Sequence, residues 1–293
     1  MSPRYQGRHI RHRRLRPFLR AGLILLLVVL CCWGFIEPKL LQVETVTLTS
    51  AELDATVGRL RLVYVSDIHM GSWPYLSTAD LAGLVSKINQ QNADLVILGG
   101  DYGNSSEDAI AFFEALPSIR STYGIYAVLG ECDRTLPESN LIALETAMKT
   151  RSITPVINDV VSIRIGTKNI YLAGVDDISA NCDVSGVAAK CKSTDFVIFA
   201  AHNPEIIATA LTVNGADGKR NWFDLGLFGH THGGQISIFG SLFHVPSADT
   251  IYTEGWYTPN KLSILVSPGV GTSGTPIRLG HYPTLHVINI KSE

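Results

Sequence analysis

Short apolar runs of strand length recur along most of the chain and constrain the fold more than any other feature. Ten such runs occur at residues 60–66, 94–99, 124–130, 160–165, 169–175, 195–200, 224–229, 235–240, 262–267 and 284–290. Apolar runs of this length, separated by turn residues, are typical of buried strands. About ten strands exceed what one sheet usually holds, so we expect two packed sheets.

Helical patterns occupy the intervals between the early runs. We expect helices at 77–92, 105–119, 137–150 and 204–212. The first of them opens with Ser and Thr, which cap helices well, and repeats Leu and Ile on one face. The first half of the chain therefore reads β-α-β-α-β, whereas the second half is mostly strands. We predict one α/β domain over residues 45–293 because no long linker or internal repeat follows residue 45.

The first 36 residues have a different character from this domain. Residues 1–20 contain seven Arg and no acid, and residues 21–36 contain no charge at all. Three interpretations are open for the apolar run: a cleaved signal peptide, a buried core helix or an uncleaved membrane anchor. We favour the anchor, because no small-residue cleavage site follows and arginines beside an apolar run are typical of membrane proteins.

This interpretation predicts the topology of the chain. Residues 1–20 form a basic cytoplasmic tail, and residues 21–37 form a single transmembrane anchor that leaves the following domain outside the cytoplasm. Residues 21–293 have 17 basic and 26 acidic side chains, a net charge of −9. Such an acidic body is poorly suited to the phosphates of nucleic acids, so we expect no nucleic-acid binding.

Two cysteines in the predicted domain bear on its redox state. Cys182 and Cys191 lie nine positions apart in a polar stretch. They form a local disulfide if the domain is exported, or remain two free thiols; the sequence leaves both possibilities open.

Side chains that can bind metals follow five of the apolar runs. They are Asp67, His69, Asp101, Glu131, Cys132, Asp133, His202, His230 and His232. The ends of parallel strands meet at one edge of a sheet, where α/β folds build their sites. Each residue alone is explained by a turn or by a hydrogen-bonded histidine. Five such groups in succession, each after a strand, instead predict a metal site.

The motifs resemble those of the calcineurin-like metallophosphoesterase superfamily. The resemblance is carried by the segments SDIHMG, LGGD, GECD, AAHNP and GHTHGGQI, and it covers essentially all of residues 60–240. The segment SPGVGTSGTPIRLG, residues 267–280, further resembles the membrane-associated bacterial branch of YkuE-like phosphodiesterases. The resemblance implies a four-layer αββα sandwich, in which two mixed β-sheets are flanked by helices and preceded by one transmembrane helix.

The resemblance also implies a centre of two divalent metal ions. Asp67, His69 and His232 would hold one ion, Glu131, His202 and His230 would hold the other, and Asp101 would bridge them. Mixed carboxylate and imidazole ligands suit Mn, Fe or Zn. Two such ions lower the pKa of a shared water and clamp the phosphate oxygens during hydrolysis.

The segment GECD departs from the usual Gly-Asn-His-Asp pattern of the family. Glu131 replaces the Asn ligand and adds a negative charge, which should tighten metal binding and weaken the attraction for an anionic substrate. Cys132 replaces the His that donates a proton to the leaving group, with Asp133 orienting it. A thiol is a poorer acid than imidazolium at neutral pH, so a catalytic thiol and a small buried residue both remain open for Cys132.

The preferred function is hydrolysis of a phosphodiester or diphosphate, including lipid-linked or envelope substrates, by an enzyme that is attached to the cell membrane. Two alternatives are a diphosphatase of the UDP-2,3-diacylglucosamine type, which acts on the cytoplasmic face, and a catalytically weak metal-binding envelope scaffold. The sequence predicts no particular oligomeric state.

Overall fold

Two six-stranded mixed sheets form the body of the protein in a computed structural model that describes residues 15–71, 78–135, 137–238, 241–242 and 250–293. In spatial order, the first sheet contains β1 (Gln42–Ser50), β14 (Thr284–Ser292), β2 (Arg59–Val65), β3 (Leu95–Leu98), β4 (Ile125–Ala127) and β5 (Ile153–Pro155). Strands β2 to β5 are parallel, β14 runs antiparallel to β2, and β1 pairs with β14 in parallel.

The second sheet is built in the same manner around a parallel centre. In spatial order it contains β12 (Gly255–Tyr257), β13 (Ser263–Val266), β9 (Leu225–Phe228), β8 (Val197–Ala200), β7 (Lys168–Gly174) and β6 (Asp159–Ile165). Strands β13, β9, β8 and β7 are parallel, and the two outer strands are antiparallel to their neighbours. A separate two-stranded hairpin is formed by β10 (Ser237–Ile238) and β11 (Ser241–Leu242).

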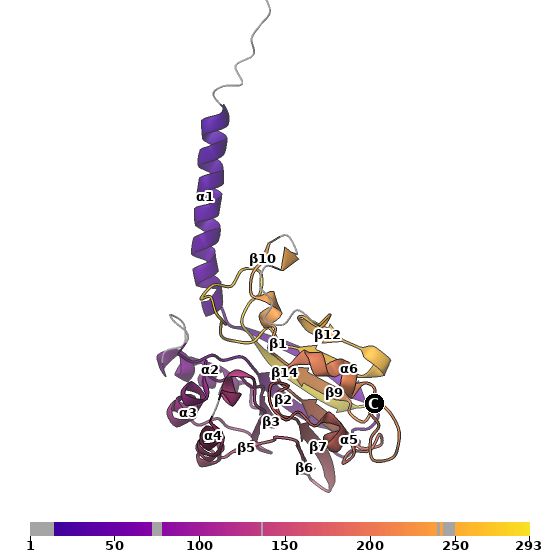
Figure 1. The fold of residues 1–293 in the computed structure, drawn as a ribbon. Coiled ribbons are helices and arrows are strands. Elements are labelled where there is room, and N and C mark those ends of the chain that lie inside the picture. The colour runs from indigo at the N-terminus through magenta and orange to yellow at the C-terminus, as the bar shows by residue number, and fades with distance from the viewer. Residues whose placement is uncertain (1–14, 72–77, 136, 239–240, 243–249) are drawn as a thin grey trace, which may run out of the picture.

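Helices cover the outer face of each sheet (Figure 1). Helices α2 (Thr78–Gln90), α3 (Ser106–Ala115) and α4 (Glu138–Thr150) pack on the first sheet, and α5 (Val184–Ala188) and α6 (Ile207–Ala210) pack on the second. Short 3-10 turns are η1 (Glu37–Lys39), η2 (Cys132–Arg134), η3 (Pro204–Ile206), η4 (His232–Gly234) and η5 (Pro259–Lys261). This arrangement confirms the predicted αββα sandwich of two mixed sheets.

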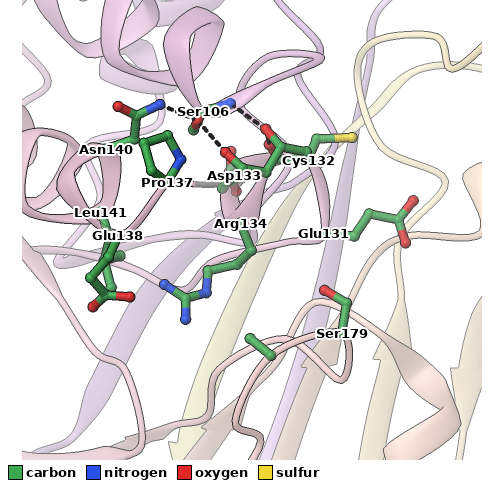
Figure 2. Close-up of a pocket in the computed structure, with 12 residues that line it drawn as sticks. Ser106, Glu131, Cys132, Asp133, Arg134, Pro137, Glu138, Asn140, Leu141 and Ser179 are labelled. Atoms are coloured by element: carbon green, nitrogen blue, oxygen red, sulfur yellow. Dashed lines mark hydrogen bonds between the residues drawn. The ribbon is translucent and has the colours of Figure 1, made fainter.

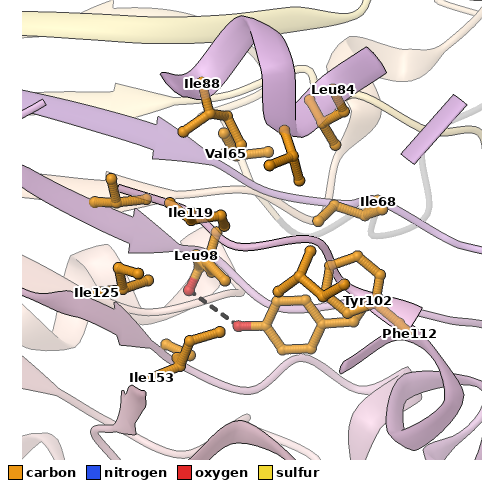
Figure 3. Close-up of a cluster of buried hydrophobic side chains, with 14 of the residues drawn as sticks. Val65, Ile68, Leu84, Ile88, Leu98, Tyr102, Phe112, Ile119, Ile125 and Ile153 are labelled. Carbon is orange, nitrogen blue, oxygen red and sulfur yellow. Dashed lines mark hydrogen bonds between the residues drawn. The ribbon is translucent and has the colours of Figure 1, made fainter. Parts of the chain in front are cut away.

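Three apolar clusters hold the layers together. One lies between the sheets, and the other two lie between each sheet and its helices. In the cluster under α2 and α3, the buried Tyr102 donates its hydroxyl to Leu98 O at 3.1 Å and Val128 O at 2.6 Å (Figure 3). These bonds tie the segment after β3 to the ends of two strands.

Helix α1 (Leu15–Ile36) projects away from the sheets (Figure 1). The segment Pro17–Lys39 is long and apolar enough to cross a membrane, with only 6% of its most apolar window buried. The helix is therefore not buried among the described residues of the domain. Residues 1–14 of the predicted basic tail lie outside the described residues.

Several elements differ from the sequence-based expectation for local reasons. Strand β1 was not expected, because its residues are mostly exposed at a sheet edge and its sequence, QVETVTLTS, alternates polar and apolar residues instead of forming an apolar run. Helix α3 ends at Ala115 rather than 119, since Pro117 disfavours a helical conformation at the residue before it. The expected helix at 204–212 is a 3-10 turn followed by one α-helical turn. Residues 239–240 of the expected strand at 235–240 lie outside the described residues.

The two cysteines of the polar stretch are not joined. Cys182 and Cys191 are free thiols, and Cys191 is buried in the cluster beneath α5 and α6. Cys191 therefore acts as a small apolar side chain in that core.

Candidate metal centre

The candidate ligands meet where the central parallel strands of both sheets end. They follow β2 (Asp67, His69), β3 (Asp101), β4 (Glu131), β8 (His202) and β9 (His230, His232). Parallel strands direct their carboxyl ends to one edge, and the two packed sheets place two such edges side by side. All of these side chains are buried except that of Glu131, which is 43% exposed.

Five of these residues have an unusual backbone conformation. Asp67, His69, Asp101, His230 and His232 have φ between 47° and 69°. Residues other than Gly rarely adopt this region, and each such residue costs on the order of 1–3 kcal/mol. Neighbouring strand ends hold two of them in place, since Asp67 N donates to Gly100 O and His69 N donates to Asp101 O, both at 3.0 Å. Strain of this kind collects at functional sites.

We call Asp67, His69 and His232 the first group. The Nε2 atoms of His69 and His232 lie 3.1 Å apart, and His232 Nε2 lies 3.6 Å from Asp67 Oδ1. His69 Nδ1 lies 3.0 Å from the side-chain oxygen of Asn104, which can only accept a hydrogen bond. The bond therefore places the His69 proton on Nδ1 and leaves the Nε2 lone pair facing the other two residues.

We call Glu131, His202 and His230 the second group. His230 Nδ1 lies 3.3 Å from Glu131 Oε2. His202 Nδ1 donates to Gly99 O at 2.8 Å, which leaves its Nε2 lone pair free. Asp101 contacts both groups, because its Oδ2 lies 3.4 Å from His202 Nε2 and 3.5 Å from His69 Nε2.

The buried polar atoms of this cluster fit metal binding. Asp67 Oδ2, His202 Nε2 and His230 Nδ1 are buried and have no hydrogen-bond partner among the described residues. Buried polar atoms are normally satisfied, and a bound ion would satisfy the three that face this cluster. The potential ligand atoms of Asp67, His69 and His232 all lie within 4.8 Å of one another, as do those of Asp67, Asp101 and His202. The cluster therefore has the composition and spacing to hold metal ions.

Two of the histidines are kept neutral. Burial, followed by the neighbouring His69 and Arg278, lowers the pKa of His232 well below its usual value. Burial, followed by the neighbouring His202, lowers the pKa of His230 to about 4. The neutral ring is the form that binds a metal.

The pKa values of two carboxylates in the cluster shift in opposite directions. Burial disfavours the charged form of Asp101, but His202 and His69 outweigh it and lower the pKa of Asp101. The same pairing raises the pKa of His202 against the effect of burial, so a proton competes with a metal there. Burial, followed by the charge of Asp101, raises the pKa of Glu131 to about 7.

Cys132 and Asp133 lie in the turn η2 (Figure 2), which bonds to Asp101. Cys132 N donates to Asp101 Oδ1 at 2.9 Å, and burial, followed by the charge of Asp101, raises the pKa of the thiol. The Asp133 carboxylate accepts the backbone N–H groups of Asp101, Tyr102 and Gly130 at 2.8, 3.1 and 2.9 Å. Figure 2 shows the Cys132 sulfur pointing away from that carboxylate. This geometry fits a carboxylate that fixes the turn beneath Asp101 better than one that orients the thiol.

A cavity of about 670 Å³ opens beside Glu131 and Cys132 (Figure 2). It reaches the start of α4, and its wall includes Arg134, Glu138, Leu141 and Ser179. The guanidinium of Arg134 lies 3.2 Å from Asp176 Oδ1, so its charge is largely compensated. The cavity offers space for a group attached to a phosphate in the cluster.

Three residues around the cluster were not singled out in the sequence. Asp177 follows β7, is 2% exposed and has one oxygen without a partner among the described residues. Its charge raises the pKa values of Glu131 and His230, both of the second group. The sequence pattern could have identified Asp177, because Asp176 and Asp177 follow the apolar run 169–175 just as Asp67 follows the run 60–66. Asn104 was not predictable, because it is one polar residue in a loop, and Arg278 lies in the segment 267–280 that resembles YkuE-like proteins but was not itself predicted to have a role.

The matches to known proteins agree with this geometry. YkuE of Bacillus subtilis (strain 168), an uncharacterized metallophosphoesterase, is 26% identical over 268 residues and covers 88% of each chain. An uncharacterized metallophosphoesterase of Helicobacter pylori (strain ATCC 700392 / 26695) is 29% identical over 282 aligned positions, and the alignment covers 92% of this chain and 70% of that one. The transmembrane protein with metallophosphoesterase domain of Bos taurus is 29% identical over 295 aligned positions, and the alignment covers 91% of this chain and 60% of that one.

The family model for calcineurin-like phosphoesterases matches residues 60–234, which include all of the candidate ligands. This match and the relationship to YkuE confirm the resemblance seen in the motifs. Members of this family use divalent metal ions, and the buried Asp and His cluster can hold them. The chain belongs to the calcineurin-like phosphoesterase family and is a phosphoric ester hydrolase with a candidate membrane-spanning helix at its N-terminus.

Proposed function

We propose that this chain is a membrane-anchored phosphodiesterase that uses two divalent ions, held by the first and second groups and bridged by Asp101. The observation that carries the proposal is the position of Asp101, whose Oδ2 lies within 3.5 Å of a histidine from each group. A carboxylate in this position can serve two ions at once. Mn, Fe and Zn all suit its mixed oxygen and nitrogen donors.

The residues around the ions have separate tasks in this proposal. Bound ions of this kind neutralise phosphate charge and activate water for in-line attack. His69 and His202 keep fixed tautomers through Asn104 and the Gly99 carbonyl, so their lone pairs stay directed at the cluster. Asp133 acts as a positioning residue, since its carboxylate fixes the backbone at Asp101.

Charge favours a phosphodiester over a phosphomonoester. Glu131 supplies a third carboxylate beside Asp67 and Asp101, and the charge of the buried Asp177 also raises the pKa of Glu131. These negative charges offset much of the positive charge that two divalent ions would bring. A diester carries one negative charge on its phosphate, whereas a monoester carries nearly two at neutral pH, so the diester is repelled less.

Cys132 restricts the leaving group. Its thiol has a raised pKa and holds its proton at neutral pH, so it donates that proton poorly. The favoured substrates are therefore those whose leaving group needs little protonation. Among them, a diphosphate bond is the second candidate, because the departing phosphate is a stabilised anion.

The membrane helix places the reaction at a membrane surface. We propose that residues 1–20 lie in the cytoplasm, that residues 21–37 cross the membrane and that the domain 45–293 lies on the outer side, because arginine-rich flanks stay inside. A lipid-linked or envelope phosphoester is then within reach. Protease treatment of intact cells should digest the domain, whereas an inward-facing domain would be protected.

The test of the activity uses the full chain purified in detergent with added Mn. We expect hydrolysis of bis(p-nitrophenyl) phosphate, slower hydrolysis of p-nitrophenyl phosphate, and a steep loss of rate as the leaving group of the diester becomes more basic. Asp101→Ala should abolish turnover, whereas the exposed control Asp159→Ala on β6 should not. A wild-type chain that binds Mn but hydrolyses no diester or diphosphate would leave only a metal-binding scaffold.

A further inference from the structure

Arg278 is a buried cation close to the candidate metal centre. Its side chain is 0% exposed, and it forms no ion pair with a carboxylate within 4.0 Å among the described residues. A charge in such a place is costly unless other groups compensate it. The hydrogen-bond partners of its guanidinium therefore indicate the structural role of Arg278.

The guanidinium of Arg278 bonds to the backbone of its own loop. Nη2 donates to Pro268 O at 2.7 Å and to Gly271 O at 2.6 Å, Nε donates to Gly271 O at 2.9 Å, and Nη1 donates to His281 O at 3.2 Å. One planar group thus joins both ends of the loop 268–281. The rigid fork of donors in arginine suits this task, and lysine has no equivalent.

This loop packs against the first group. Gly271 N donates to Asp67 O at 2.7 Å, and Val270 N donates to Ser66 O at 3.1 Å. A Cβ added at Gly269 would lie 2.5 Å from the Cβ of Asp67, so the two backbones are as close as they can be. The Nη1 atom of Arg278 also donates to the backbone O of His232 at 3.5 Å. Arg278 therefore contacts two of the three residues of the first group, Asp67 through the loop and His232 through its backbone carbonyl.

The same loop contacts the end of the membrane helix. Arg278 N donates to Gly34 O in the last turn of α1 at 3.1 Å. A Cβ at Gly34 would lie 2.6 Å from Cγ2 of Ile277, so Gly34 permits this close approach. Glu37, directly after the helix, is 1% exposed and accepts a hydrogen bond from Trp33 Nε1 at 2.8 Å. The last turn of α1 is thus packed on the catalytic domain rather than joined to it by a free linker.

We propose that Arg278 is a positioning residue that connects the last turn of the membrane helix to the first group of the metal centre. The proposal rests on the proposed function, because it takes the first group to bind a metal. None of the contacts described for Arg278 reaches the second group. Loss of the guanidinium should therefore weaken one metal position and spare the other.

The main experiment measures Mn binding to the full chain in detergent, by calorimetry and by metal analysis after gel filtration. We expect Arg278→Met to weaken one of two Mn sites by about 10- to 100-fold, the usual effect of losing a residue that supports a ligand. Arg278→Lys should recover only part of this affinity. The control is Arg151→Met. Arg151 also donates to backbone carbonyls, but these belong to Phe113 and Glu114, which are not part of the candidate metal centre.

A second pair of variants tests the contact with the helix. Gly34→Leu places a side chain against Ile277 and should weaken the same Mn site by about three- to tenfold, as a smaller displacement of a ligand support. Gly22→Leu is the control, since a Cβ at Gly22 meets no atom within 4 Å. Equal behaviour of the two glycine variants would overturn the link to the helix.

The outcomes separate this proposal from the proposed function. If Arg278→Met keeps both Mn sites at wild-type affinity, or loses both sites equally while circular dichroism shows a folded chain, the positioning role is overturned. If Arg278→Met does not fold, Arg278→Lys and Gly34→Leu decide, and wild-type affinity at both sites in these two variants overturns the role. If the wild-type chain binds two Mn and hydrolyses no phosphoester, the proposed function fails while the positioning role stands.

Discussion

The two halves of the candidate metal centre are built to different degrees of rigidity. The first group is completely buried, and its potential ligand atoms lie within 4.8 Å of one another. The loop 268–281, which Arg278 holds together, packs against it. The second group includes Glu131, whose side chain is 43% exposed and borders the open cavity. The enclosed half is preorganised, whereas the open half has room to adapt to a substrate.

The difference between the halves follows from the elements that carry them. The first group comes from β2 and β9, which lie at the centres of the two sheets. Glu131 follows β4, a strand of three residues next to the edge strand β5. A site with one firm and one adaptable position can hold one ion permanently while the other takes part in substrate binding. We therefore expect the two positions to respond differently to the same kind of substitution.

The largest difference should come from removing one carboxylate from each half. Asp67→Asn should empty the first position and lower kcat/KM on the order of a thousandfold, because a bound ion contributes several kcal/mol to the transition state. In Asp67→Asn the amide oxygen stays bonded to His230 N, as Asp67 Oδ1 is at 2.9 Å, so the amide nitrogen faces the ion and cannot bind it. Glu131→Gln retains an amide oxygen that its exposed side chain can turn toward the ion, so it should keep both ions with a loss of about tenfold or less. Metal analysis and rates on the same samples check both statements. An equal loss in the two variants would remove the distinction between the halves.

The next largest effect concerns the proton donor on the open side. Cys132→His places an imidazole beside Asp101 and should raise kcat on substrates with basic leaving groups by about 100-fold, within the usual range for general acid catalysis. Cys132→Ser should leave those rates unchanged, because a hydroxyl donates no better than the thiol. A leaving-group series with the three chains measures this. An unchanged slope for Cys132→His would show that position 132 does not face the leaving group.

Acidification should empty the open half first. The pKa of Glu131 is raised to about 7, so below this pH the carboxyl holds a proton that an ion must displace. Affinity at the second position should therefore fall as pH decreases through 7, by up to tenfold per unit. The first position should persist further into acid, because the pKa of His232 lies well below its usual value. Mn stoichiometry between pH 8 and 5 distinguishes the order of loss.

The sequence predicted the parts of this centre that depend on strand order. Apolar runs followed by Asp and His were sufficient to predict the two sheets and to bring Asp67, Asp101 and His202 to one edge. Parallel strands leave little freedom in where their ends lie. The same rule applied to the run 169–175 would have included Asp177, which was overlooked.

The supporting residues were not predictable in the same way. Arg278 reaches His232 across 46 positions of the sequence, and its partners are backbone carbonyls that no residue type reveals. The orientation of Asp133 toward three backbone amides likewise depends on the exact path of the turn. Contacts of this kind are made by the tertiary structure and have no local sequence pattern.

The smallest effect we expect concerns the hydrogen bond that fixes His69. Asn104→Ala removes the acceptor of the Nδ1 proton and frees the ring to rotate or change tautomer, so affinity at the first position should fall by about tenfold. The second position should be unaffected, because His202 is fixed by the backbone carbonyl of Gly99 instead. Asn89→Ala in α2 is the control, since its side chain bonds to Ser118 and Arg120 rather than to a ligand. Calorimetric titration with Mn measures both positions in each chain. A loss confined to the first position would show that the enclosed half depends on individual supporting contacts, whereas a loss shared by both would show that the two halves bind as one unit.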